Sequence, residues 1–189
     1  MIGKEAQEAP IPKIKLSVPP VHPHHLKRER VEQLLTDAMD IPRSVILVSA
    51  PPGYGKSSLL AGWLLSENGD RAWLTLDSED DDPGRFTSYL FHALGPHLSP
   101  EGARPLTALS GGYHPGGAET LAVSLSNLLA ERARPLLLVL DDYHLIESAG
   151  VHEILEELLR LQPPQFHIAI LTREDPPLPL ARLRAQGRL

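Results

Sequence analysis

The stretch SVILVSAPPGYGKSSLLAGWLL (44–65) restricts the possible fold more than any other part of this sequence. It opens with a continuous apolar run (44–50), rich in β-branched residues, which is typical of a strand buried on both faces of a parallel sheet. The run SSLLAGWLL at its end indicates a helix. Between them lies a Gly- and Pro-rich turn that ends in G-K-S, as in the phosphate-binding pattern G-x-x-x-x-G-K-[ST]. A strand, a tight loop and a helix in this order predict an α/β domain.

The rest of the chain repeats the alternation of strand and helix. Further apolar runs predict strands at 71–77, 135–142 and 166–172. Apolar residues at helical spacing predict helices after Arg28 (Val31, Leu34, Leu35, Met39), after Asp82-Pro83 (Phe86, Leu90, Ala93, Leu94), and over 121–128 and 151–159. Asp82 provides an N-cap and Pro83 fits the first helical position. We therefore expect an α/β fold with three layers and a mostly parallel sheet.

Two segments differ in composition from this pattern. Residues 1–24 are dense in proline, which predicts an extended arm that is ordered only in part, so we divide the chain into an arm (1–24) and one domain (25–189). Residues 95–117 are rich in Gly and Pro and predict a long connection with at most one short helix. The cluster HPHH (22–25) would rarely form a metal site in such an arm.

Composition excludes several classes of protein. The chain has no cysteine, which rules out disulfides, thiolate chemistry and Cys-based zinc sites, and no apolar run approaches the ~20 residues of a membrane span. The amino terminus lacks the apolar core of a secretory signal, so we expect a cytoplasmic protein. The net charge of −6 and the acidic run DSEDDDPG (77–84) argue against direct DNA binding by this domain.

The G-K-S turn predicts a site for nucleotide phosphates. Gly53 and Gly55 allow the backbone to approach phosphate oxygens, Lys56 would reach the β- and γ-phosphates, and Ser57 would offer its hydroxyl to Mg²⁺. The pattern has Gly at its first position, where this chain has Ala50, whose small methyl is tolerable if its backbone angles are ordinary. The predicted binding residues of the loop are Ala50, Pro51, Pro52, Gly53, Tyr54, Gly55, Lys56, Ser57 and Ser58. The alternative is a chance Gly/Pro-rich turn, which the flanking strand and helix disfavour.

Two later strands end in residues that fit such a site. LLLVLDDYH (136–144) ends in two acids, of which Asp141 would hold Mg²⁺ and Asp142 would orient or activate water, although acids after a strand are also common in ordinary turns. IAILTRED (168–175) places Arg173 after a strand, where it is either a contact to the γ-phosphate or a surface arginine. In a parallel sheet the carboxyl ends of the strands meet at one edge, which is where ligands bind.

Taken together, LVSAPPGYGKSSLL, LLLVLDDYHLIES and ILTREDPPLPLARLRAQGRL resemble the ATPase domain of MalT-type, LuxR-family transcriptional regulators of the STAND class. The resemblance runs from about Lys13 to the last residue. It implies a phosphate role for Lys56, an acidic pair at Asp141 and Asp142, and a sensor role for Arg173. KRERV (27–31) resembles the R-x-R-L stretch that lies near the adenine, which assigns Arg28 there. This family commonly has Ala where the general pattern has its first Gly.

The resemblance also implies a function and a larger protein. It implies a P-loop NTPase core that binds ATP or ADP with Mg²⁺, hydrolyses ATP slowly, and controls self-association and contacts with other domains of a regulator. The related sheet order is 5-1-4-3-2, of which the four predicted strands make up 1-4-3-2. We expect the fifth strand, lid, winged helix, sensor repeats and helix-turn-helix to lie beyond Leu189. The edge of the 44–50 strand would then be unpaired.

Two other functional classes stay open from the residues alone. A small-molecule kinase would use the same loop but needs an acceptor pocket and converging arginines. The arginines near the end (Arg182, Arg184, Arg188) read more simply as a solvated helix face. An interaction module would bind nucleotide without turning it over.

Overall fold

Four parallel strands form the sheet at the centre of the computed structural model, which describes residues 11–22, 24–99 and 116–189. The strands are β1 (Val45–Ser49), β2 (Asp70–Thr75), β3 (Leu136–Asp141) and β4 (Phe166–Thr172), and they lie in the order β1-β4-β3-β2. Each neighbouring pair is parallel. The predicted α/β class, the strand positions and the order 1-4-3-2 are thus confirmed, and the carboxyl ends of all four strands lie at one edge.

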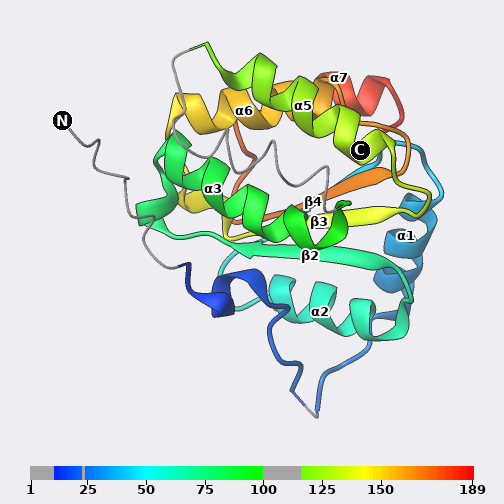
Figure 1. Cartoon of the computed structure of the whole chain (residues 1–189). Coiled ribbons are helices and arrows are strands. Elements are labelled where there is room, and N and C mark those ends of the chain that lie inside the picture. The colour runs from blue at the N-terminus through cyan, green and yellow to red at the C-terminus, as the bar shows by residue number, and fades with distance from the viewer. Residues whose placement is uncertain (1–10, 23, 100–115) are drawn as a thin grey trace.

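Helices cover both faces of the sheet (Figure 1). One face carries α1 (Glu29–Met39) and α2 (Lys56–Ser66), and the other carries α3 (Pro83–Leu94), α5 (Ala118–Ala130) and α6 (Ala149–Arg160), with α7 (Leu180–Ala185) near the end of the chain. Short 3₁₀ turns are η1 (Lys13–Leu16), η2 (Ser78–Asp80), η3 (Gly95–His97) and η4 (Tyr143–Leu145). The arrangement is the predicted three-layer sandwich.

Apolar residues fill the space on each side of the sheet. All residues of β3 and β4 are buried, as expected of central strands covered on both faces. Trp63 and Trp73 are both 2% exposed and belong to the core beneath α1 and α2, as their positions predict. Leu34 was expected in the same helical stripe but is 61% exposed. The buried side of α1 centres on Leu35, with Val31, Ala38 and Met39 beside it, so the stripe is narrower than the sequence suggests.

Side-chain caps set the start of α3. The Asp82 carboxylate accepts a hydrogen bond from the Arg85 N–H (2.8 Å), and Pro83 is the first helical residue, as predicted. Beyond α3, most of the segment 95–117, in which at most one short helix was expected, lies outside the described residues, and η3 covers Gly95–His97. None of the described helices is both long and apolar enough to cross a membrane.

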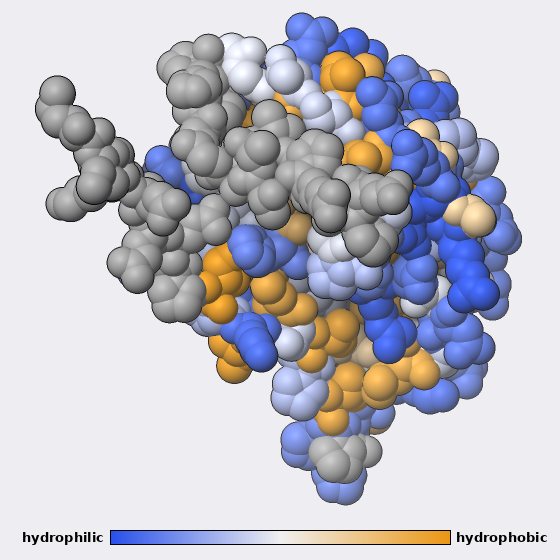
Figure 2. All heavy atoms as spheres, viewed as in Figure 1, coloured by the Kyte–Doolittle hydropathy of each residue, from blue (hydrophilic) through white to orange (hydrophobic). Residues whose placement is uncertain are grey.

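The N-terminal segment differs from the extended arm that its prolines predict. It forms the 3₁₀ turn η1, and Ile11 and Leu16 pack against the core beneath α3, α5 and α6, whereas Val18 packs against the core on the opposite face. The segment therefore passes from one face of the sheet to the other beside the edge strand β2. Apolar side chains gather around η1 and α2 on the face shown in Figure 2. Ile14 of η1 is 80% exposed. The domain limit at residue 24 stays a prediction.

The last residues of the chain lie beside the first strand. The Val45 N–H donates a hydrogen bond of 2.7 Å to the Arg188 carbonyl. This contact satisfies one outward-facing amide at the start of β1, which is otherwise an edge strand. A fifth strand next to β1 stays a prediction.

Candidate functional site

The site is built at the carboxyl edge, where β4 lies between β1 and β3. The Ala50 N–H donates to the Thr172 carbonyl (3.2 Å), which joins the loop after β1 to the end of β4. Asp141 is the last residue of β3. The topology therefore brings the G-K-S loop, the two acids and Arg173 to one edge of the sheet, although they are far apart in sequence. Open parallel sheets bind ligands at this edge.

The loop has the backbone conformation that a phosphate cradle requires. Gly53 (φ 82°) and Gly55 (φ 77°) both adopt left-handed angles, and Gly55 is the N-cap of α2. Ala50 has no positive φ, so its backbone meets the condition under which alanine is tolerated there. The free N–H groups and positive end of α2 point at the loop, as in other anion sites at helix N-termini.

Lys56 is the first residue of α2 and is buried. Its ammonium donates hydrogen bonds to the loop's own carbonyls, at 2.8 Å to Ala50 and 3.4 Å to Pro51. The charge therefore lies against the inside of the loop and has only neutral acceptors in these two contacts. A phosphate oxygen would be a stronger partner for this ammonium, so the loop fits an anionic ligand.

Ser57 and Asp141 meet across the edge. The Ser57 hydroxyl donates to Asp141 Oδ1 (2.9 Å), and the same oxygen accepts the Asp142 N–H (3.0 Å). Burial raises the pKa of Asp141, and the hydrogen bond from Ser57 opposes that shift. A hydroxyl and a carboxylate are the hard oxygen donors that Mg²⁺ prefers. Among the described residues no three His, Asp or Glu side chains form a metal site by themselves, the HPHH histidines included.

Asp142 differs from its neighbour in exposure and backbone. Its side chain is 39% exposed, whereas Asp141 is 4% exposed. Asp142 adopts a left-handed conformation (φ 58°, ψ 35°), which aspartate tolerates better than most residues. The chain turns there from β3 into η4, so one acid stays in the sheet edge and the other reaches solvent.

His144 joins this cluster and was not singled out by the sequence analysis. Its side chain is 8% exposed, and neither ring nitrogen has a hydrogen-bond partner within the described part of the chain. Nδ1 lies 3.9 Å from Asp142 Oδ1. Burial lowers the pKa of His144, and the positive charge of Arg173 lowers it further. In the sequence, the available signal was its position two residues after the acids in LDDYH. In the structure, the signal is its burial without a partner within the described residues, which often marks a binding site.

The remaining predicted residues lie around this centre. Arg28 precedes α1, and its guanidinium donates to the Tyr54 carbonyl in the loop (3.1 Å). Arg173 directly follows β4 and is exposed, and its charge reaches His144. Ser58 is exposed on the first turn of α2. The structure thus brings Arg28 against the loop by a direct contact and places Arg173 beside the cluster.

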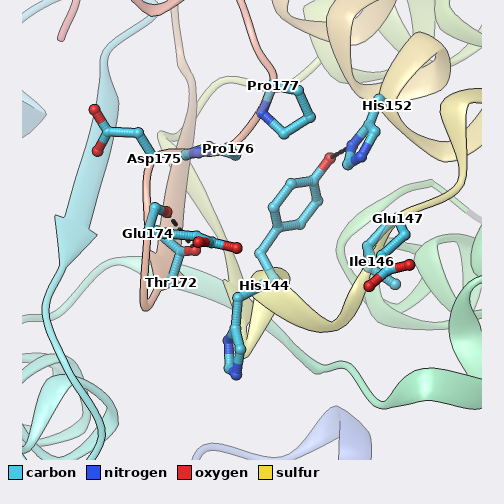
Figure 3. A pocket seen from close by; sticks show the side chains of 10 residues that line it. His144, Ile146, Glu147, His152, Thr172, Glu174, Asp175, Pro176 and Pro177 are labelled. Atoms are coloured by element: carbon cyan, nitrogen blue, oxygen red, sulfur yellow. Dashed lines mark hydrogen bonds between the residues drawn. The ribbon is translucent and has the colours of Figure 1, made fainter.

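A cavity of about 240 Å³ adjoins the site, between η4, α6 and the loop after β4 (Figure 3). The Tyr143 hydroxyl and His152 Nδ1 share a hydrogen bond of 2.8 Å at its back. The His144 ring points away from this pair in Figure 3. The two neighbouring residues of η4 therefore point in different directions. Tyr143 packs into the domain, and His144 lies beside Asp142.

Comparison with known proteins agrees with this geometry. Residues 26–171 match the AAA ATPase domain family. The chain belongs to the AAA ATPase domain family. It is also 35% identical over 183 residues to the HTH-type transcriptional regulator MalT of two Klebsiella pneumoniae strains. The match covers 93% of this chain and 19% of those regulators, so the chain spans about a fifth of the length of these relatives.

Solved structures show the same fold at low sequence identity. The Walker-type ATPase PABY2304 of Pyrococcus abyssi superposes with a TM-score of 0.51 at 14% identity, covering 81% of this chain and 47% of that one. A chain of Drosophila ORC bound to DNA gives a TM-score of 0.51 at 14% identity, covering 91% and 47%. These similarities support the P-loop architecture of the AAA ATPase domain.

Proposed function

We propose that this AAA ATPase domain is the ATP-binding switch of a cytoplasmic MalT-type transcriptional regulator and that it hydrolyses ATP slowly. The observation that carries the proposal is the 2.9 Å hydrogen bond between Ser57 and Asp141. It joins the first turn of α2 to the end of β3, which are 84 residues apart in sequence. A hydroxyl and a carboxylate that meet beside a left-handed glycine loop are the pair that Mg²⁺ and a triphosphate require together.

Binding would use the loop and its neighbours. The backbone N–H groups between Ala50 and Ser58 would hold the phosphates, with Lys56 leaving its two carbonyl partners for phosphate oxygens. Ser57 and Asp141 would hold Mg²⁺, which neutralises phosphate charge when bound. Arg28, fixed on the Tyr54 carbonyl, would lie at the adenine side of the loop.

Hydrolysis would use the exposed part of the cluster. Asp142 reaches solvent and would orient the attacking water or accept its proton. His144 is buried beside Asp142 and its pKa is lowered, so a neutral ring would help to position the Asp142 carboxylate. Arg173 would contact the γ-phosphate and so distinguish ATP from ADP.

The switch follows from that difference. A ligand shifts a conformational equilibrium only by the difference in its affinity for the two states, and here the γ-phosphate would supply that difference through Arg173 and through the Mg²⁺ that Ser57 and Asp141 would hold. We infer that the ATP-bound state favours self-association and altered contacts with the other domains of the regulator. The net charge of −6 makes this domain an unsuitable DNA-binding part, so DNA recognition would fall to another domain.

Asp142→Ala tests the proposal. The variant should bind ATP with unchanged affinity, measured by calorimetry, because Asp142 is not among the phosphate or metal ligands. Its phosphate release should fall by about 100-fold or more, since a positioned base contributes that much. Glu156→Ala, which removes an exposed carboxylate on α6, serves as the control and should keep wild-type turnover. Equal phosphate release from Asp142→Ala and the control would refute hydrolysis at this centre, and bound ATP without any turnover in the wild type would favour a purely nucleotide-binding module.

A further inference from the structure

The N-terminal segment is clamped to the acidic loop after β2 by a half-buried lysine, Lys15. Lys15 Nζ lies 2.6 Å from Asp77 Oδ2 and 2.6 Å from Asp80 Oδ2. The Lys15 side chain is only 12% exposed and that of Asp80 is fully buried. Removing Lys15 would take one cation from a fully buried carboxylate, which costs more than the loss of a surface partner.

A second cation completes the clamp. Arg85 on α3 donates to Asp80 Oδ1 (3.2 Å) and to Glu79 Oε2 (2.7 Å). Both cations lie over the Tyr89 ring, with Lys15 Nζ 5.0 Å and Arg85 Cζ 5.3 Å from its centroid. Beyond the N-cap at Asp82 and its contribution to net charge, the acidic run 77–84 therefore forms specific ion pairs through Asp77, Glu79 and Asp80.

The same loop also holds the connection that follows the acidic pair. Asp81 Oδ1 accepts hydrogen bonds from the N–H groups of Glu147 (2.7 Å) and Ser148 (2.6 Å), just before α6. These residues follow η4, which carries His144. The 77–82 loop is thus bound to Lys15 through Asp80 and to the β3–α6 connection through the next residue, Asp81.

The other end of the N-terminal segment reaches the phosphate loop. His25 lies against Gly62 of α2, where a Cβ would come within 2.3 Å of His25 Nε2. Three residues later, Arg28 donates to the Tyr54 carbonyl. We call the described residues 11–22 and 24–28 the strap. The strap therefore contacts the phosphate loop at one end and, through the 77–82 loop, the β3–α6 connection at the other.

We propose that the strap couples the phosphate loop to the acidic pair, with Lys15 as the positioning residue that keeps the β3–α6 connection in place. When Lys15 releases the 77–82 loop, Asp81 loses its fixed position, and the turn that carries Asp142 and His144 loosens. Release at this end also leaves the strap free to move, and with it Arg28, which contacts the phosphate loop. Only the nucleotide readout below rests on the proposed function.

Hydrogen exchange of the nucleotide-free 189-residue chain tests the coupling. Lys15→Met keeps the apolar stem and removes the charge, Lys15→Arg restores the charge, and Lys13→Met is the matched control, since Lys13 is exposed on the same turn. In Lys15→Met the amides of Glu147 and Ser148 should exchange about 2- to 30-fold faster, the range that such couplings span. Lys15→Arg should recover most of the protection, and Lys13→Met should match the wild type.

Other exchange patterns would overturn the proposal. Faster exchange confined to residues 11–22 would show that the clamp holds only the strap. Uniformly faster exchange, with the β4 amides affected as much as Glu147 and Ser148, would show a purely structural role.

The affinity for ADP provides the second readout. Lys15→Met should weaken it about 2- to 30-fold, while Lys13→Met leaves it unchanged. Gly62→Ala tests the strap without touching the ion pair, because its new methyl displaces His25. It should weaken ADP binding in the same direction, and unchanged affinity in both Lys15→Met and Gly62→Ala would contradict the coupling. If the wild-type chain does not bind ADP at all, the proposed function fails, and the exchange experiment still decides the coupling.

Discussion

The two ends of the sheet bury polar groups in opposite ways. At the amino end, Ser44 Oγ and His167 Nδ1 share a hydrogen bond of 2.7 Å. Gln162 Nε2 donates to the carbonyls of Ser44 (3.2 Å) and Phe166 (2.6 Å), while its Oε1 accepts from Arg188 (2.7 Å). At the carboxyl end, Asp141 keeps an ionisable carboxylate in a buried position and both His144 nitrogens lack a partner within the described residues.

The difference separates structural burial from functional burial. A buried polar network that is fully paired stabilises one arrangement of the chain. A buried group that is charged or unpartnered costs stability in the free protein and gains when a ligand supplies the missing contact. Burial alone would therefore select both ends as candidate sites. Pairing separates the Ser44, Gln162 and His167 group from Asp141 and His144, although Arg132 Nε, beside Asp70 at the start of β2, also lacks a partner within the described residues.

Lys56→Ala should show the largest difference between its effect on ATP affinity and its effect on stability. Within the described part of the chain, the ammonium has only the two loop carbonyls as hydrogen-bond partners, so we expect a loss of at most about 1 kcal/mol in the free energy of unfolding. The affinity for ATP should fall about 100-fold or more, because a buried charge-assisted contact to phosphate is lost. Calorimetry and urea unfolding measure the two effects on the same samples. Undiminished ATP affinity in this variant would sink the assignment of the loop.

Gln162→Leu should give the opposite pattern at the amino end. Its removal takes the amide donor from the Phe166 carbonyl and the acceptor from Arg188, while the Ser44 carbonyl keeps the Ile168 N–H, and a buried group that loses its partner costs about 1–3 kcal/mol. We expect the free energy of unfolding to fall by about 2–4 kcal/mol and the ATP affinity of the folded fraction to stay unchanged. A loss of ATP affinity in folded Gln162→Leu would break the proposed separation of the two ends.

Asp141→Asn should change the free energy of unfolding in the opposite direction to the two variants above. An amide oxygen at this position still accepts from Ser57 and from the Asp142 N–H but carries no charge. The nucleotide-free variant should be more stable at pH 7 by about 1 kcal/mol, as is common when a strained functional group is neutralised. Mg²⁺ should no longer strengthen its ATP binding.

The pH dependence of that gain follows from the raised pKa of Asp141. Above its folded-state pKa the ionised carboxylate carries the full cost of burial. As the pH falls toward the ordinary value of about 3.9, protonation removes that cost from the wild type, so the two proteins converge. Unfolding curves from pH 7 down to pH 4 check this, and a difference that grows with acidity would contradict burial as the cause.

Local patterns in the sequence were sufficient for the framework of the fold. The apolar runs that become β1, β3 and β4 are confirmed almost residue by residue, because central parallel strands need apolar side chains on both faces. The start of α3 at Pro83 is confirmed, because capping depends on neighbours in sequence. The positive φ of Gly53 and Gly55 belongs to the same class, since both conformations favour glycine for local reasons.

Contacts between distant segments were beyond those patterns. Residues 1–24 were predicted as an extended arm because prolines restrict the backbone, whereas the docking of the described part of that arm depends on Lys15 meeting acids more than 60 residues away. The exposure of Leu34 and the burial of His144 likewise depend on which neighbours arrive in the folded chain. None of these contacts can be recognised from the spacing of residues within a single segment of the sequence.

By itself, then, the sequence determined a parallel α/β domain with a glycine loop suited to phosphates, because strand burial, capping and left-handed turns are decided by adjacent residues. The tertiary structure decided that Ser57 meets Asp141, that His144 is buried beside Asp142, and that the strap is clamped by Lys15. These pairings are set by the order of the strands and by packing across the sheet, where interactions join residues that no local pattern brings together.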